Sequence, residues 1–136
     1  MPQEPEEVTR AAYEGFNREK RLPRELYHHD AVYVNSREDP DHGAWEGIDA
    51  IEELAQSWVE AYPDLVVEPV EVLVNGDTVF AWTRFSGHGA GSGMSIDMQL
   101  AHVVTIEDGK IRRLEEYMDR AEGLHVAGLA ERPVES

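Results

Sequence analysis

The sequence predicts one α+β domain, in which a cone-shaped, curved antiparallel sheet packs on three N-terminal helices and leaves a pocket at its open end. The segments with helical periodicity lie within residues 6–61, whereas strand-forming runs fill most of residues 65–119. The pairs Asn75-Gly76 and Asp108-Gly109 supply the positive φ angles of tight turns between those runs. A chain of 136 residues suits a single core, so we expect one domain over residues 1–136.

Two helical segments precede the first predicted strand. Apolar residues recur at helical spacing over residues 6–19, and acidic residues gather at the start, where the helix dipole favours them. Pro23 fits the first turn of a short second helix over residues 23–29. Residues 31–35, with the sequence AVYVN, are rich in strand formers and predict the first strand.

A third helix is predicted from about Ile48 to Ala61, because apolar residues three or four apart form one stripe and Pro63 ends the helix. Trp58 lies on that stripe, where it is either a core anchor or a surface on which a ligand stacks. The residues before the helix have loop composition, and their His42 and Trp45 are candidates for the lip of a pocket.

Four strands follow, joined mainly by tight turns. Residues 65–74 and 78–86 form a hairpin about the Asn-Gly pair, and residues 94–119 form another about the Asp-Gly pair. Residues 87–93, GHGAGSG, lack the Gly-Lys-Ser/Thr ending of a phosphate-binding loop and predict a flexible connection. The tail, residues 120–136, either docks through a few apolar side chains or stays mobile.

The Asp-Gly turn also predicts a register for the last two strands. With a two-residue loop, residues pair symmetrically about the turn, which places His102 opposite Glu115. Tyr117 and Asp119 then share that side of the ribbon with aliphatic residues. Burying charged or polar groups there is costly unless they are paired, so these side chains either form structural pairs or line a cavity. We favour the cavity.

A series of short motifs runs along the chain in a recognisable order. They are Leu26-Tyr27 with Asp30-Ala-Val-Tyr-Val34, Trp45-Glu-Gly-Ile-Asp-Ala-Ile51, Ala61-Tyr-Pro-Asp-Leu65, Asn75-Gly-Asp77, Trp82-Thr83 with His88, and Glu107-Asp-Gly-Lys-Ile111 with Glu116-Tyr-Met-Asp119. In order and spacing the sequence resembles the nuclear transport factor 2-like superfamily, and within it the SnoaL-like group that includes polyketide cyclases. The resemblance covers nearly the whole chain and implies the fold. It implies less about chemistry, because this scaffold hosts isomerases, cyclases, dehydratases, epoxide hydrolases and binding modules.

The resemblance also implies roles for single residues. The closing Tyr-x-Asp is similar to the pattern in which SnoaL-like cyclases and limonene epoxide hydrolases place a catalytic aspartate, which makes Asp119 a candidate. His102 falls near the oxyanion-stabilising aspartic acid of ketosteroid isomerases and is a usable donor. Their general base corresponds to Asn35, whose amide cannot take a proton, and their helix tyrosine aligns with Ala12 rather than Tyr13.

What remains is a cyclase-like pair, His102 with Asp119. Steroid isomerisation lacks its base, and the Arg-x-Asp of the epoxide hydrolases is broken because Arg84 is followed by Phe85-Ser86. The predicted register separates His102 from Asp119 by about 13 Å along the ribbon, so the two would act on opposite ends of a ligand.

We therefore expect a cofactor-independent acid/base enzyme of isomerase, cyclase or lyase type that acts on a hydrophobic carbonyl-containing small molecule. Asp119 is the expected base or acid, and His102 is expected to polarise the oxygen. The candidate substrate-binding residues are Tyr117, Glu115, Asn35, Arg84, Trp58 and Trp45. The alternative is a non-catalytic small-molecule-binding or dimerisation module of the same fold, in which His102 and Glu115 form a structural pair and Arg84 closes a salt bridge.

Composition limits the partners. The formal net charge of −16 argues against nucleic acid and anionic membranes, which need clustered positive charge. The N-terminus does not resemble a signal peptide and no apolar run is long enough for a membrane span, so a cytoplasmic protein is expected. There is no cysteine, and no group of residues has metal-ligand spacing, so we expect neither a metal nor a cofactor. A homodimer is expected through the outer sheet face, with Ala101, Val103, Leu114 and Met118.

Overall fold

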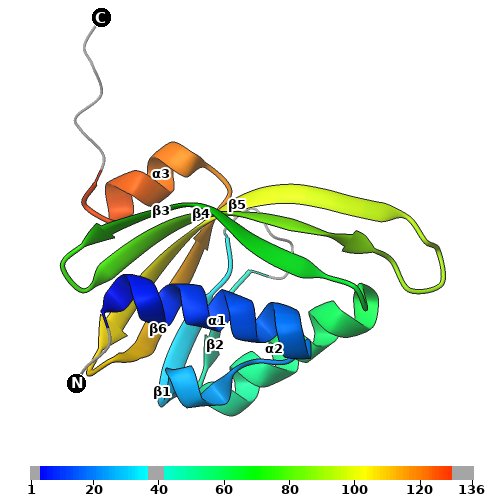
Figure 1. Ribbon diagram of the computed structural model, residues 1–136, viewed down its shortest axis with the longest axis horizontal. Coiled ribbons are helices and arrows are strands. Elements are labelled where there is room, and N and C mark those ends of the chain that lie inside the picture. Colours follow the sequence, from blue (N-terminus) through cyan, green and yellow to red (C-terminus); the bar gives the residue numbers. More distant parts are fainter. Residues whose placement is uncertain (1–3, 37–41, 130–136) are drawn as a thin grey trace, which may run out of the picture.

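The computed structural model describes residues 4–36 and 42–129 and confirms the α+β fold (Figure 1). Its elements, in chain order, are α1 (Pro5–Glu19), the 3-10 turn η1 (Arg24–Leu26), β1 (Tyr27–Val34), β2 (Ala44–Glu46), α2 (Ile48–Ala61), β3 (Val66–Asn75), β4 (Thr78–His88), β5 (Ser95–Glu107), β6 (Lys110–Tyr117) and α3 (Arg120–Val126). Both predicted hairpins form, one about Asp108-Gly109 as predicted and the other about Gly76-Asp77, because Asn75 still pairs with Thr78. Parts of the predicted lip loop and of the tail, residues 37–41 and 130–136, lie outside the described residues.

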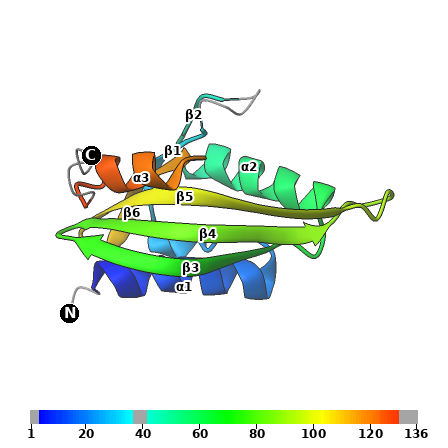
Figure 2. The same cartoon turned by 90° about the horizontal axis from the view of Figure 1, so that it is seen from above.

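Six strands form one curled open sheet in the order β2-β1-β6-β5-β4-β3. Neighbouring strands are antiparallel except β1 and β6, which run parallel, so the sheet is mixed. A parallel pair needs a long crossover, and here β2, α2, β3, β4 and β5 lie between its strands in the sequence. Figure 1 shows α1 and α2 on one side of β3–β5 and α3 on the other, and Figure 2 shows β4 and β5 running most of the length of the molecule.

Alternation along β4 distinguishes the two faces of the sheet. Val79, Ala81 and Phe85 are buried in the main core together with residues of α1 and α2. Phe80 points the other way and belongs to a smaller cluster with residues beneath α3. Arg84 shares the outer face with Phe80 and is exposed. We call the side toward α1 and α2 the inner face and the other side the outer face.

Two short segments differ from the sequence-based expectation. The helix expected over residues 23–29 is a single 3-10 turn, because β1 begins at Tyr27, whose side chain is buried in the core. The tail forms α3, which begins where the carboxylate of Asp119 accepts a hydrogen bond from the backbone N–H of Ala121 at 3.0 Å.

The predicted register of the β5–β6 hairpin is wrong beyond the first pairs. Asp108 and Gly109 both have positive φ, and the residues beside the turn pair as expected. A bulge then adds Arg112 to β6, so that Val104 lies opposite Leu114 and His102 lies opposite Glu116. An extra residue exchanges the faces of everything beyond it. The bulge is favoured because it buries Leu114 on the inner face.

The predicted dimer surface is also only partly on the outer face. Ala101 and Val103 lie there, in the cluster that α3 covers, whereas Leu114 belongs to the main core. The homodimer itself stays a prediction.

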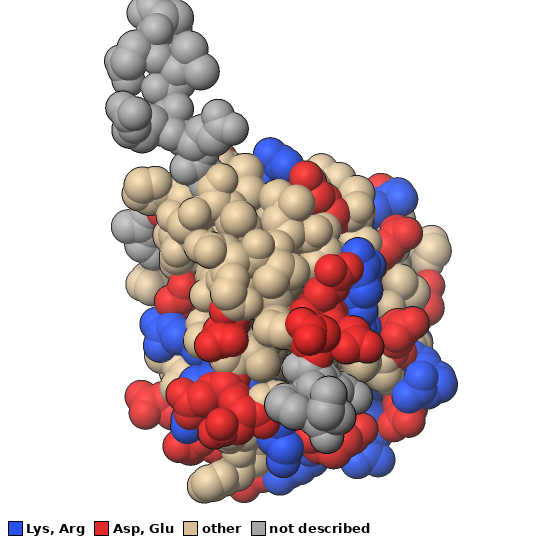
Figure 3. Space-filling view, turned by 60° about the vertical axis from the view of Figure 1, so that its left-hand side comes forward, with Lys and Arg blue, Asp and Glu red and all other residues tan. Residues whose placement is uncertain are grey.

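In Figure 3, acidic side chains with interspersed basic ones surround an area without charged residues. None of the described helices is long and apolar enough to cross a membrane.

Candidate functional site

Two adjoining hollows lie between the inner face and the helices. The inner chamber, about 50 Å³, has largely apolar walls from α1, α2 and the sheet. Its side chains with polar atoms are Thr9, Tyr13, Tyr27, Tyr33, Trp58 and His102. The outer pocket, about 380 Å³, has an apolar wall and a polar side formed by Asn35, Ser36 and Glu116. Trp58 and Phe85 line both hollows and therefore stand at their junction.

Tyr13 and His102 form a buried pair in the inner chamber. The Tyr13 hydroxyl oxygen and His102 Nδ1 are 2.7 Å apart, and the two rings are nearly parallel. Since α1 supplies the tyrosine and β5 the histidine, the pair links the first helix to the middle of the sheet. His102 is only 3% exposed, and its Nε2 has no hydrogen-bond partner among the described residues.

Burial keeps both side chains of this pair neutral. Desolvation lowers the pKa of His102 to about 3 and raises the pKa of Tyr13 well above its usual value. The hydroxyl proton of Tyr13 needs an acceptor, and Nδ1 is the atom that lies in reach. With Tyr13 donating to Nδ1, the single proton of the neutral imidazole is on Nε2. His102 Nε2 is thus a buried N–H donor in this chamber without a partner among the described residues.

A second polar pair, Tyr33 and Glu116, lies beside the first. Tyr33 on β1 donates to Glu116 Oε2 at 2.5 Å, and the backbone N–H of Ser36 donates to Oε1 at 3.4 Å. Glu116 is 6% exposed and is the register partner of His102. Side chains of directly opposed residues project from the same face, so the imidazole and the carboxylate are neighbours across two strands.

The tyrosine hydroxyls around the chamber are donors rather than phenolates. Burial raises the pKa of Tyr27 and of Tyr33, and the nearby carboxylate of Glu116 raises the pKa of Tyr33 further. Among its described lining residues, the inner chamber has no charged side chain. Neutral donors in an apolar chamber suit a ligand oxygen, and they suit it better as negative charge develops on that oxygen.

The bulge moves the predicted partners of His102 away from it. Glu115 and Tyr117 project from the outer face, where the Tyr117 hydroxyl donates to Glu115 at 3.2 Å and Glu115 pairs with Arg113 at 2.7 Å. Asp119 follows β6, is exposed, and caps α3. It lines neither hollow. The structure therefore does not bring Asp119 or Glu115 to His102, and Glu116 occupies the place predicted for Glu115.

The other predicted substrate-binding residues are divided between the two faces. Asn35 lines the outer pocket and accepts a hydrogen bond at 2.5 Å from the indole N–H of Trp45, which lies outside both hollows. Trp58 stands between the hollows. Arg84 is on the outer face, where two of its nitrogens bind Asp97 at 2.9 and 2.7 Å. It therefore closes a salt bridge, as the alternative interpretation of the sequence expected.

Sequence reasoning missed Tyr13, Tyr33 and Glu116 as site residues. Tyr33 shares a face with buried Ala31 along β1, but the run of apolar residues from 31 to 34 gives no alternation that would indicate this face from the sequence. For Glu116 the signal was the three-residue spacing of Ile111 and Leu114, since both can lie on the inner face only if β6 contains a bulge. Tyr13 lies next to the aligned Ala12, and only the helix orientation shows that it reaches His102.

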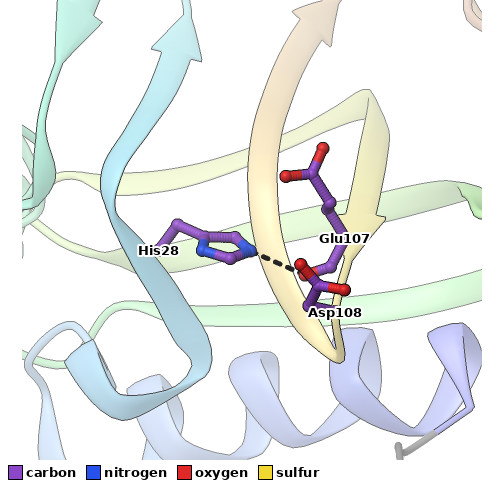
Figure 4. Close-up of side chains that lie close together, drawn as sticks. All are labelled: His28, Glu107 and Asp108. Atoms are coloured by element: carbon purple, nitrogen blue, oxygen red, sulfur yellow. Dashed lines mark hydrogen bonds between the residues drawn. The ribbon is translucent and has the colours of Figure 1, made fainter.

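A separate group of potential metal ligands lies at the edge of the sheet. Ligand atoms of His28, Glu107 and Asp108 are within 4.8 Å of one another (Figure 4). His28 on β1 points toward the β5–β6 turn, and its Nε2 bonds the backbone carbonyl of Glu107 at 2.6 Å. The Glu107 carboxylate already pairs with Arg112 at 2.6 Å. These contacts join β1 to the turn and account for the group without a metal.

Comparison with known proteins finds a family model that matches most of the chain. The model of the SnoaL-like domain matches residues 9–114, which include both polar pairs except Glu116. A search of curated proteins finds no match.

Several solved structures are similar to this one. Bal32a, from a soil-derived mobile gene cassette, has a TM-score of 0.73 at 19% identity, with 82% of this chain and 86% of that chain covered. A protein assigned as a polyketide cyclase from Sinorhizobium meliloti has a TM-score of 0.65 at 26% identity, covering 81% and 93%. A Catenulispora acidiphila protein with a ketosteroid isomerase-like fold, in complex with trimethylamine, has a TM-score of 0.68 at 18% identity, covering 96% of each. At these identities the likeness shows the fold.

Proposed function

The chain belongs to the SnoaL-like family, and from that premise we propose that it is a cofactor-independent acid/base enzyme acting on a hydrophobic, carbonyl-containing small molecule. The observation that carries the proposal is the buried His102 Nε2, which has no partner among the described residues and lies in an apolar chamber. An unpaired donor in such surroundings costs stability unless a ligand supplies an acceptor. The polyketide cyclase assignment of one similar structure supports the same class of substrate.

In this proposal His102 polarises the carbonyl oxygen. Its Nε2–H donates to the oxygen, and Tyr13 holds the ring in that tautomer through Nδ1. Because the imidazole is neutral, it stabilises a developing enolate as a hydrogen-bond donor and does not have to deliver a full proton.

Glu116 is the proposed base in place of Asp119. It is buried, it lies directly across the strands from His102, and Tyr33 fixes the orientation of its carboxylate. A base must reach the carbon next to the carbonyl that His102 holds, and neighbouring side chains meet this requirement. In the proton-transfer step Glu116 takes the proton from that carbon, and the electron pair of the C–H bond moves into the enolate.

Exchange of α-protons tests this step without knowledge of the natural substrate. We expect the protein to catalyse exchange of the methyl protons of 2-acetylnaphthalene for deuterium in D₂O, followed by proton NMR. Glu116→Gln removes the base and should slow the exchange by about 100-fold or more, while the ketone still binds.

Asp119→Asn is the matched control, because it changes a carboxylate that only caps a helix. We expect exchange to continue in this variant at a rate within about threefold of the original. Equal exchange by the original protein and Glu116→Gln, or loss of exchange in Asp119→Asn alone, would contradict the assignment of Glu116 as base.

Ligand binding without catalysis is the second candidate function. It is favoured by the small volume of the inner chamber, about 50 Å³, and by the engagement of Asp119 as a helix cap. Its expected result is saturable binding of the ketone with no exchange above that of buffer alone.

A further inference from the structure

His102 and Glu116 are neighbours along the sheet, yet they line different hollows. His102 Nε2 lies in the inner chamber, and Glu116 lines the outer pocket. The outer pocket, about 380 Å³, is in the range of small-molecule sites, whereas the inner chamber, about 50 Å³, has room for only a few atoms. A ligand that meets both side chains must therefore extend from one hollow into the other.

Trp58 and Phe85 stand where the two hollows meet. Their rings are edge to face with centroids 6.1 Å apart, and Tyr33 contacts Trp58 with centroids 5.6 Å apart. Within the described part of the chain, ring packing holds the Trp58 indole and no hydrogen bond does. Trp45 differs, since its indole N–H is tied to Asn35. Trp58 is also only partly buried, so its ring has space to turn on the solvent side.

The lining of the inner chamber limits what can enter it. The described lining residues include aliphatic and aromatic side chains, neutral tyrosines and the neutral His102, with no charged group. A carboxylate or an ammonium group would lose its hydration there without gaining a counter-ion. A neutral carbonyl group loses less and gains the hydrogen bond from Nε2.

We propose that the side chain of Trp58 is a gate between the two hollows. The ligand is a flat, elongated, apolar molecule with a neutral carbonyl group at one end. The carbonyl oxygen passes Trp58 and accepts the hydrogen bond of His102, the carbon next to the carbonyl lies at the junction near Glu116, and the body of the molecule stays in the outer pocket. Trp58 thus selects for narrow ends and against bulky ones, and the lining of the inner chamber selects against charged ones. The identity of the carbonyl group rests on the proposed function, but the test measures binding rather than turnover.

Two probes of nearly the same shape separate the carbonyl contact from simple apolar binding. These are 2-acetylnaphthalene and 2-isopropylnaphthalene, which differ in the group that would meet His102. We expect the ketone to bind about tenfold more tightly, as measured by titration of protein fluorescence. His102→Phe should remove this preference, because it removes the donor and keeps a ring in place.

Association kinetics test whether Trp58 acts as a gate. Stopped-flow mixing with 2-acetylnaphthalene should show an association rate about tenfold higher for Trp58→Ala than for the original chain, because the probe no longer waits for the ring to turn. Trp58→Leu keeps more of the packing and serves if the alanine variant has a lowered melting temperature. Trp82→Phe, on the outer face and away from both hollows, is the matched control, and its association rate should equal that of the original chain.

The outcomes distinguish this inference from the proposed function. Equal association rates in the original chain and both Trp58 variants would show that Trp58 is not a gate. Equal affinities for the two probes would show that His102 makes no hydrogen bond to the carbonyl group. A carbonyl preference with a Trp58-dependent rate supports the inference even if no α-proton is exchanged. Glu116-dependent exchange at a rate that Trp58 substitutions leave unchanged would overturn the inference and leave the enzyme proposal standing.

Discussion

His102 lies in surroundings that strongly disfavour the charged form of its imidazole. Its ring is enclosed by Tyr13, Tyr33 and Phe85, all with ring centroids within 6.3 Å, and only one of its two nitrogens has a partner among the described residues. Leaving a buried polar atom unpaired costs about 1–3 kcal/mol. The unpaired nitrogen therefore lowers the stability of the free protein, and it offers a hydrogen bond to a ligand. This combination is expected of a residue that functions in binding or catalysis.

The depressed pKa of His102 predicts a dependence of stability on pH. Its pKa falls from an ordinary 6.5 in the unfolded chain to about 3 in the folded protein, so the unfolded state binds the proton first as the pH falls. The folded protein therefore loses free energy of unfolding progressively as the pH falls below 6.5. We expect the free energy of unfolding to drop by about 2 kcal/mol between pH 7 and pH 5 from this residue alone.

Urea denaturation at the two pH values measures this effect, with His102→Gln as the control. The glutamine variant does not titrate, so its loss of stability over the same interval should be smaller by about 2 kcal/mol. An identical loss in both proteins would show that the imidazole is not desolvated.

At the scale of elements, turn chemistry and periodicity predicted most of the fold. Asp108-Gly109 forms a hairpin turn as predicted, the other turn lies one residue later than predicted, at Gly76-Asp77, and α2 has the predicted bounds. The parallel pairing of β1 with β6 could not be predicted, because it depends on contacts between segments about 80 residues apart. The prediction that Glu115 and Tyr117 face His102 failed because of the bulge at Arg112, since turn geometry sets the register only as far as the strands stay regular.

The packing of α3 on the outer face depends on a glycine. A Cβ added at Gly123 would lie 2.6 Å from Ala101 Cβ and 3.1 Å from Phe80 Cε1, and the first of these atoms is fixed to a central strand. We expect Gly123→Ala to reduce the free energy of unfolding by about 1–3 kcal/mol despite the better helix propensity of alanine.

The double variant Gly123→Ala/Ala101→Gly checks the cause of that loss, because it removes the atom with which the new methyl group collides. Denaturant unfolding should show that Gly123→Ala costs less when Ala101 is already glycine. Equal costs in both backgrounds would contradict the close approach of α3 to Ala101.

For the whole molecule, charge is the dominant surface property. The net charge is −16, and acidic side chains recur across the face in Figure 3. The ion pairs on the surface, such as Arg84 with Asp97 and Arg10 with Glu6, involve half-exposed partners and contribute little each. Repulsion among the excess carboxylates therefore outweighs them, and it opposes the compact state.

Salt should accordingly stabilise this protein. Raising the NaCl concentration from about 10 mM to about 300 mM shortens the range of the repulsion, and we expect the melting temperature to rise by about 3 °C or more. Differential scanning calorimetry at both concentrations measures the shift, and KCl should give the same result as NaCl. A lower melting temperature in salt would mean that the ion pairs dominate instead.

The extra residue in β6 has a consequence for how such proteins diversify. Removing Arg112 would turn Glu115 and Tyr117 toward the helices and Glu116 toward solvent, with every other amino acid unchanged. A lineage can therefore acquire a new set of interior groups through a single codon gained or lost, and an alignment drawn without a gap at this strand would pair the interior of one relative with the exterior of another.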